Sequence, residues 1–139
     1  MTSSPNIKYI DMVIVGAGFA GLYMIYRARQ CGLSVQCYEI GAREGGTWYW
    51  NRYPGARVDI ECVEYSYSFS KELEQEWDWS ERYASQPEIE RYANHVAERF
   101  DLRRDIQFNT RVTAAHFDES TQRWQVEPDT GERVSARFC

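Results

Sequence analysis

Residues 13–21, Val-Ile-Val-Gly-Ala-Gly-Phe-Ala-Gly, decide the fold of this chain of 139 amino acids. An apolar run leads into three glycines with the spacing Gly-x-Gly-x-x-Gly, and residues 19–31 continue with the composition of a helix. Gly16 allows a sharp turn out of a strand, Gly18 has no Cβ to keep a phosphate from the backbone, and Gly21 lets the helix pack closely on the strand. A strand, a glycine turn and a helix N-terminus in this order predict a site for the diphosphate of a dinucleotide.

An acidic residue closes the second predicted strand, residues 35–39. Glu39 follows Gly21 by eighteen residues, which is where a carboxylate accepts hydrogen bonds from the ribose of a bound dinucleotide. A 2′-phosphate beside Glu39 would meet like charge, so the site is expected to take FAD or NAD and not NADP. The alternative is a βαβ turn without a ligand, in which Glu39 is a surface residue.

The charge balance and the cysteines exclude several partners. Sixteen Lys and Arg stand against twenty-one Asp and Glu, a net charge of −5 without a basic cluster, so neither nucleic acid nor an anionic membrane is expected to bind. The first residues are polar and the apolar run after them is interrupted, so we expect a cytoplasmic protein without a signal peptide or membrane span. The four cysteines lack metal-ligand spacing and are expected to be reduced thiols, with no metal site.

The hydrophobic periodicity predicts one α/β domain with a Rossmann-like fold. After a flexible lead-in over residues 1–8, residues 9–139 are expected to form a parallel sheet with crossover helices and a small antiparallel β ribbon on top of the sheet. The expected helices cover residues 19–31, 71–77 and 85–102, and the expected strands or extended segments cover residues 9–15, 35–39, 60–70, 106–109, 112–116, 124–126 and 134–138. His95 lies off the apolar stripe of the last helix, so a solvated histidine is expected there.

A long aromatic loop follows the second predicted strand. Residues 45–55, Gly-Gly-Thr-Trp-Tyr-Trp-Asn-Arg-Tyr-Pro-Gly, have neither helical nor strand periodicity. Their flat aromatic side chains could cover a ring system, because irregular loops of this length are uncommon unless they have a function. An Ω-loop that only caps the sheet with its own aromatic side chains explains the composition equally well.

Three stretches of the sequence resemble one enzyme family. Residues 15–23, residues 45–59 and residues 83–88, Tyr-Ala-Ser-Gln-Pro-Glu, are together similar to the N-terminal FAD-binding part of the Baeyer-Villiger monooxygenases, with the phenylacetone and steroid monooxygenase branch nearest. The middle block is far more specific than any glycine pattern. The resemblance implies a flavoenzyme that takes hydride from NADPH and forms a C4a-peroxyflavin with O2, which inserts an oxygen next to the carbonyl of a small-molecule ketone to give an ester or lactone.

The resemblance also assigns roles to individual residues. It implies that the FAD diphosphate lies at Gly16, Gly18, Phe19 and Gly21, and that the ribose lies at Glu39. The adenine is expected at the backbone of Val112, the flavin near Tyr65, and the rest of the cofactor at Thr47, Trp48, Tyr49 and Trp50. The nicotinamide side is expected at Arg57, Val58 and Asp59. Asp59 matches the family's catalytic aspartate beside the flavin, where a carboxylate can partner a cation that stabilises a peroxide anion. Without the surrounding motif, a loop ion pair of Asp59 with Arg57 or Arg52 would be the simpler interpretation.

Several parts of the family pattern do not occur in these residues: the second glycine-rich motif, which binds NADPH, the fingerprint that contains His and Trp, and the arginine partner of the aspartate. We therefore expect a FAD-binding domain that is incomplete at its C-terminal end and inactive alone. Its open sheet edge is expected to associate with the missing C-terminal part or with a second copy. The alternative is a non-catalytic FAD-binding module or one half of a split flavoenzyme. Flavin N- or S-oxygenation fits the glycines but not the aromatic block.

Overall fold

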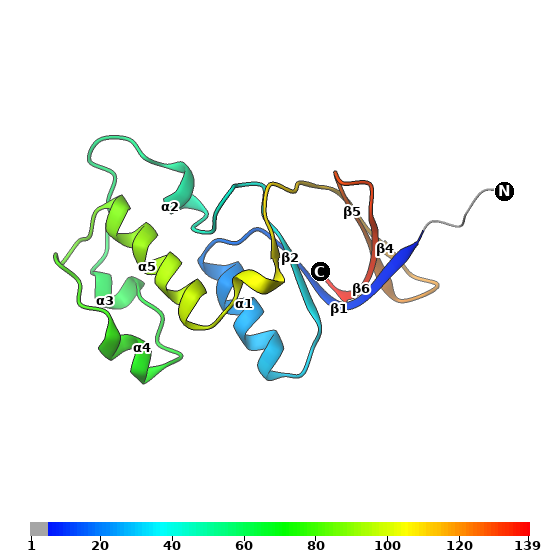
Figure 1. Cartoon of the computed structure of the whole chain (residues 1–139), viewed down its shortest axis with the longest axis horizontal. Coiled ribbons are helices and arrows are strands. Elements are labelled where there is room, and N and C mark those ends of the chain that lie inside the picture. Colours follow the sequence, from blue (N-terminus) through cyan, green and yellow to red (C-terminus); the bar gives the residue numbers. More distant parts are fainter. Residues whose placement is uncertain (1–5) are drawn as a thin grey trace.

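The computed structural model describes residues 6–139 and contains one six-stranded sheet with helices beside it (Figure 1). The strands are β1 (Ile7–Val15), β2 (Val35–Tyr38), β3 (Ile106–Gln107), β4 (Val112–Asp118), β5 (Arg123–Pro128) and β6 (Arg133–Phe138). The helices are α1 (Phe19–Gln30), α2 (Thr47–Trp50), α3 (Cys62–Tyr65), α4 (Lys71–Glu76), α5 (Gln86–Arg99) and the 3₁₀ turn η1 (Arg103–Asp105). Helices α2 to α5 gather at one end of the elongated molecule, and β4 and β5 lie toward the other (Figure 1).

The sheet is parallel in one half and antiparallel in the other. Its strand order is β3-β2-β1-β6-β5-β4, in which β3, β2, β1 and β6 run parallel and β5 and β4 pair antiparallel beyond β6. The predicted α/β, Rossmann-like fold with a small antiparallel ribbon is confirmed. The ribbon is continuous with the parallel sheet through β6, and Arg123 of β5 ties the two halves together by donating to Ile10 O at 3.0 Å and to Ser135 O at 2.9 Å.

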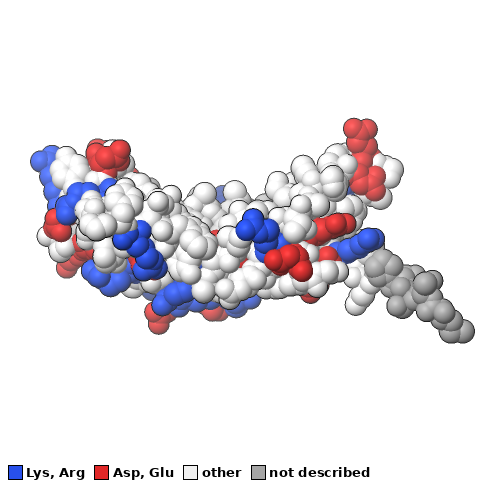
Figure 2. All heavy atoms as spheres, turned by 90° about the horizontal axis from the view of Figure 1, so that it is seen from above, with Lys and Arg blue, Asp and Glu red and all other residues white. Residues whose placement is uncertain are grey.

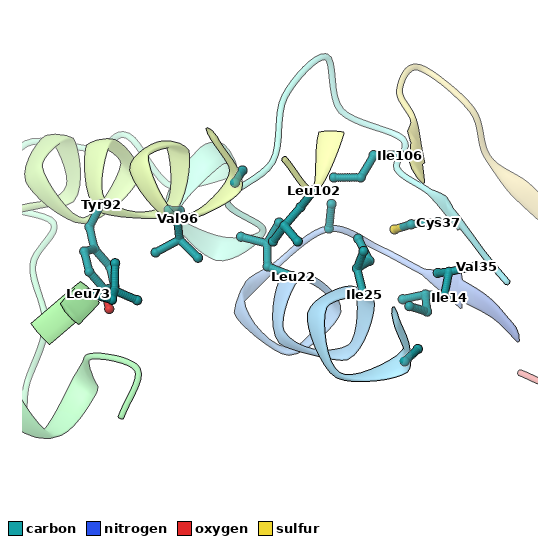
Figure 3. Packing of buried hydrophobic residues seen from close by; sticks show 14 residues of the cluster. Ile14, Leu22, Ile25, Val35, Cys37, Leu73, Tyr92, Val96, Leu102 and Ile106 are labelled. Atoms are coloured by element: carbon teal, nitrogen blue, oxygen red, sulfur yellow. The ribbon is translucent and has the colours of Figure 1, made fainter. Parts of the chain in front are cut away.

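The main hydrophobic core lies between the parallel strands and the two long helices. Leu22 and Ile25 of α1 belong to one cluster with Ile14 and Val35 of the strands and Val96 of α5 (Figure 3). Burying these side chains removes apolar surface from water, which is the main favourable term in folding. The cluster therefore fixes the path of α1 on the sheet, and with it the position of the helix N-terminus at the carboxyl end of β1.

The two long helices lie where the periodicity predicts them, and each buries one stripe. In α1 the stripe contains Leu22 and Ile25, while Tyr23 and Met24 are exposed, so the helix is less enclosed than its apolar composition suggests. His95 lies off the stripe of α5, but the expected solvated histidine is only partly exposed: its ring centroid lies 5.3 Å from that of Trp77, and its Nε2 lies 3.5 Å from Glu76 Oε2. The apolar residues buried by α5 are Ile89, Tyr92, Ala93, Val96 and Ala97. Within residues 6–139, no helix is both long and apolar enough to cross a membrane.

The first strand begins earlier than the sequence predicts. A flexible lead-in was expected over residues 1–8, but Ile7 and Lys8 already belong to β1 and pair with Arg133 and Val134 of β6. Residues 1–5 lie outside the described part of the chain. The polar sequence before Tyr9 hides this strand, because its partner β6 follows more than a hundred residues later and no local pattern reports that pairing.

The extended segment predicted over residues 60–70 is wrong in its middle. Residues 62–65 form the short helix α3, and the aromatic side chains after it do not belong to a strand. They pack instead in an aromatic cluster, in which the Phe19 ring lies 5.3 Å from Tyr65, 5.2 Å from Tyr67 and 6.0 Å from Tyr92, measured between ring centroids. The aromatic residues alternate because they are buried against neighbouring helices. An irregular segment can show the same alternation as a strand.

Cys37 on β2 gives a test of the main core. Burial, together with the charge of the neighbouring Glu39, raises the pKa of the Cys37 thiol from 9.0 to about 12. We expect Cys37 to stay protonated and unreactive toward a thiol reagent at pH 8, whereas the exposed Cys31 reacts at once. Since the folded pKa lies above the unfolded one, this thiol favours folding fully below about pH 9, and that contribution is lost as the pH rises toward 12.

Timed alkylation followed by peptide mass spectrometry would measure both reactions. The Cys31→Ser variant is the control that removes the fast reaction and leaves the core unchanged. Labelling of Cys37 in the native chain at the rate of Cys31 would contradict the burial of β2.

Candidate functional site

The turn between β1 and α1 has the geometry that the glycine spacing predicts. Gly16 has a φ of +96°, in the region that favours glycine. A Cβ on Gly21 would lie 2.0 Å from Gly16 O, so only glycine lets α1 pack this closely on the turn. A Cβ on Gly18 would meet the protein only at ordinary distances, with Gly46 Cα at 3.5 Å. Packing of the protein alone therefore does not explain glycine at position 18, whereas close approach of a ligand would.

The N-terminus of α1 opens directly after this turn. Gly18 occupies the N-cap position without a capping side chain, and the first intrahelical bond runs from Leu22 N to Gly18 O at 2.9 Å. The N–H groups before Leu22 therefore have no partner inside the helix, and they carry the positive end of its dipole. The Phe19 ring points into the aromatic cluster, so Phe19 presents only its backbone to a ligand at this end.

Glu39 is a buried structural acid as well as a candidate ligand residue. Its side chain is 4% exposed, which rules out the alternative of a surface glutamate. Its Oε2 accepts a hydrogen bond from Ala17 N at 2.6 Å, and its Oε1 accepts one from Gly41 N at 2.6 Å. The carboxylate thus joins the turn after β1 to the loop after β2. Each carboxylate oxygen has a second lone pair, so Glu39 retains acceptor capacity for hydroxyl donors.

A cavity of about 320 Å³ lies beside Glu39. It brings together four of the predicted residues, Gly16, Glu39, Trp50 and Val112, at the carboxyl ends of β1 and β2, which is where open α/β sheets bind ligands. The other residues that line it are Val15, Tyr38, Ile40, Thr110 and Arg111. In Figure 2 the surface is hollowed between the helix-rich end and the end with β4 and β5, and charged side chains of both signs gather mainly toward the two ends.

The aromatic loop divides into a buried and an exposed part. Trp48 is buried; its Nε1 donates to Tyr65 Oη at 2.8 Å, and its backbone O accepts from the Gln86 side chain. Tyr49 packs beside Trp50, with ring centroids 4.7 Å apart. Trp50 is 57% exposed and lines the cavity. Both interpretations of this loop therefore hold in part, because Trp48 caps the fold from inside and Trp50 offers a free aromatic face.

The segment that carries Asp59 lies apart from this cavity. Arg57 binds Glu81 at 3.1 Å and Tyr83 O at 3.0 Å, and Arg52 binds Glu90 at 2.5 Å. Within residues 6–139, the exposed Asp59 forms no ion pair with either arginine, so the alternative of a loop ion pair is wrong. Val58 is buried and its N–H donates to Ala84 O at 3.1 Å, which fixes the backbone on both sides of this position.

Sequence reasoning missed two features of the site. Thr110 and Arg111 line the cavity although no motif marks them, and their position directly before Val112 was the one available signal. Glu44 and Arg103 form an ion pair over 59 residues of sequence, with Nη2 and Oε1 2.6 Å apart. No metal-binding cluster of His, Cys, Asp and Glu occurs in the described part of the chain.

Comparisons with known proteins agree with this geometry. A family model described as an NAD(P)-binding Rossmann-like domain matches residues 14–74. A Baeyer-Villiger monooxygenase of Pseudooceanicola batsensis is 49% identical over 129 residues, which are 92% of this chain and 24% of the relative. A phenazine N-monooxygenase of Lysobacter antibioticus is 44% identical over 131 residues, which are 94% of this chain and 24% of the relative.

A solved structure shows the same fold. Oxidized steroid monooxygenase bound to NADP superimposes with a TM-score of 0.93 at 62% sequence identity, over 94% of this chain and 25% of that one. The chain spans about a quarter of the length of the relatives it matches. The resemblance seen in the sequence is thereby confirmed: over about a quarter of their length, this chain is similar in sequence and fold to Baeyer-Villiger monooxygenases.

Proposed function

We propose that this chain is the FAD-binding portion of a Baeyer-Villiger monooxygenase, in a domain that begins with β1. The observation that carries the proposal is the cavity at the carboxyl ends of β1 and β2, where Gly16, Glu39, Trp50 and Val112 meet beside the N-terminus of α1. When bound, FAD supplies the redox and oxygen chemistry by which such enzymes use NADPH and O2 to convert a ketone into an ester or lactone. The free cysteines suit the reducing cytoplasm, where we place the protein.

The residues present fit FAD. The N–H groups at the start of α1 and the absence of a side chain at Gly18 suit a diphosphate. The second lone pairs of Glu39 suit the hydroxyl groups of a ribose, and the backbone of Val112 with the free face of Trp50 suits an adenine. Thr47 and Tyr49 extend the proposed site from the diphosphate toward the flavin. Trp48 serves this site through its backbone, because its ring is buried.

Glu39 also explains why this site is proposed for FAD and not for NADPH. Its buried carboxylate would repel a 2′-phosphate placed at the ribose. Arg111 lines the same cavity, but within residues 6–139 no arginine side chain donates to Glu39. We place the NADPH site mostly outside these residues, with Arg57, Val58 and Asp59 on its nicotinamide side. Tyr65, held by Trp48 Nε1, would lie near the flavin. Asp59 is free to pair with a cation supplied from elsewhere in the protein.

Two other functions remain distinguishable by experiment. The chain could act as a non-catalytic FAD-binding module or as one half of a split enzyme, with the remaining part or a second copy as its partner. Oxygenation of a nitrogen atom is the second candidate, because the phenazine N-monooxygenase shares 44% identity over these residues. These residues are thus similar in enzymes named for different reactions, and the choice between a ketone and a nitrogen heterocycle as substrate is proposed to lie elsewhere in the complete protein.

Glu39→Gln tests the ribose assignment. A glutamine has one acceptor oxygen in place of two, so its NH2 group would face the N–H of Ala17 or of Gly41. We expect FAD affinity to fall by roughly tenfold or more, and the free energy of unfolding to fall by about 1–3 kcal/mol, the cost of an unsatisfied buried donor. Flavin fluorescence titration and urea unfolding measure the two effects. The exposed Glu119→Gln is the matched control, and unchanged FAD affinity in Glu39→Gln would exclude the ribose role.

The isolated chain tests the division between binding and catalysis. We expect it to retain FAD close to one per chain and to show no ketone-dependent NADPH oxidation, because it spans about a quarter of its relatives. The visible absorption spectrum with the intact mass measures the first property. NADPH absorbance and oxygen consumption with phenylacetone measure the second, and steady turnover would contradict the proposed division.

Asp59→Asn in the complete enzyme tests the proposed role of the Asp59 carboxylate in catalysis. The substitution keeps the size of the side chain and removes its charge, and the exposed carboxylate forms no ion pair within residues 6–139 that would be lost. We therefore expect FAD content to stay unchanged while the rate of ester formation falls on the order of tenfold or more. Glu64→Gln, at another exposed acid of the same segment, is the control. Wild-type ester yield from Asp59→Asn would remove this residue from the mechanism.

A further inference from the structure

An ion pair between a buried acid and a half-buried arginine lies close to the glycine turn. Glu44, in the loop between β2 and α2, is 0% exposed. Arg103 of η1 reaches it with two nitrogens: Nη2 lies 2.6 Å from Oε1, and Nε lies 3.1 Å from Oε1 and 3.3 Å from Oε2. The same Nη2 donates to Asn94 O of α5 at 3.4 Å. The pair therefore connects a loop at the carboxyl edge of the sheet to α5 and η1.

Stability alone is a weak reason for this pair. Taking the Glu44 carboxylate out of water costs more than its attraction to Arg103, whose side chain is 36% exposed, commonly returns, and apolar side chains of similar volume would often stabilise the fold as well or better. A buried pair is better explained where it fixes one arrangement of the chain. The fork of the guanidinium suits that role, because it binds a carboxylate in one orientation.

The residues that follow Glu44 pack directly on the glycine turn. Gly45 N donates to Ala17 O at 2.9 Å. Gly46 has a φ of +57°, and a Cβ on it would lie 2.9 Å from Gly18 Cα. Gly45 and Gly46 thus form a second backbone wall opposite Gly18. Any shift of this loop would open or close the space beside Gly18.

Two acids anchor the loop over residues 41–46 at its two ends. At the start, Gly41 N donates to Glu39 Oε1 at 2.6 Å. At the end, Glu44 is held by Arg103. At the second anchor, the guanidinium of Arg103 also neutralises the charge of Glu44 near the proposed anion.

We propose that Glu44 and Arg103 are positioning residues that hold Gly45 and Gly46 against Gly18 and so set the width of the diphosphate site. This inference rests on the proposed FAD function and adds to it a pair of residues that touch no part of the cofactor. Without the pair, the loop loses its second anchor while Glu39 still holds its start. The distance between Gly18 and the backbone of Gly45 and Gly46, which form the two sides of the diphosphate site, is then no longer fixed.

Apolar replacement of the whole pair separates positioning from stability. In this chain, Arg103→Met alone leaves Glu44 buried without a partner, and we expect it to lower both the urea midpoint and FAD affinity. The double variant Glu44→Met/Arg103→Met removes both charges. We expect it to regain the wild-type urea midpoint but to keep a dissociation constant for FAD at least tenfold above that of the wild type. The amide of Gly45 should also exchange its hydrogen faster, because the bond to Ala17 O is no longer held in place.

A second pair provides the control. Arg99 of α5 and Glu76 of α4 form a partly exposed ion pair outside η1, with Nε and Oε1 3.0 Å apart. Arg99→Met/Glu76→Met should change FAD affinity by less than about twofold, since the pair lies away from the glycine turn and from η1. Arg103→Lys keeps the charge but loses the fork, and should fold with FAD affinity reduced by about fivefold or more. It replaces the double variant if that protein does not fold.

The outcome of these experiments decides separately on the positioning role of Glu44 and Arg103 and on the proposed FAD function. Wild-type FAD affinity and Gly45 exchange in the double variant, or in Arg103→Lys if that variant takes its place, would overturn the positioning role and leave the FAD function standing. An equal loss of FAD affinity in the Arg99 and Glu76 variant would show a general effect of ion pairs, and would also overturn it. Absence of FAD binding by the wild-type chain would overturn the proposed function, and the diphosphate role with it.

Discussion

One buried carboxylate holds the two halves of the site in register. Ala17 N–H, in the turn after β1, and Gly41 N–H, in the loop after β2, each donate to Glu39 at 2.6 Å. The acid needs these donors, because an ionised group buried without partners is strongly unfavourable. The turn and the loop need the acid in return, since a buried N–H without an acceptor is costly. The start of α1, the glycine turn and the cavity beside Trp50 are all placed relative to these two bonds.

The same end of the sheet contains a second buried acid, and each is balanced by a different kind of group. Backbone amides surround Glu39, and a guanidinium holds Glu44. Because Arg103 neutralises it, Glu44 can lie near the positive end of α1 without cancelling the attraction of that end for an anion. The aromatic cluster around Phe19 supports this arrangement, because it fixes Phe19, the first residue of α1. Packing, hydrogen bonds and charge therefore converge on one small region.

The sequence was most informative where a signal is local. The helix periodicity placed α1 and α5, and the glycine spacing placed the turn between β1 and α1, because both patterns depend on residues within a few positions of one another. The extended segment predicted over residues 60–70 was wrong because its alternating aromatic residues pack on helices and not along a neighbouring strand. The start of β1 at Ile7 was missed for a related reason, since its pairing with β6 is distant in sequence.

By itself, the sequence determined the Rossmann-like βαβ unit, the glycine turn after its first strand and the acid at the end of the second strand. These features follow from glycine geometry, hydrophobic period and chain order, which are properties of short segments. Only the tertiary structure decided that Glu39 is buried between two amides, that Trp48 turns inward while Trp50 lines the cavity, and that Arg103 reaches Glu44. Each of these depends on which distant segments meet when the core closes, and the cost of leaving a polar group unpaired there selects the partner.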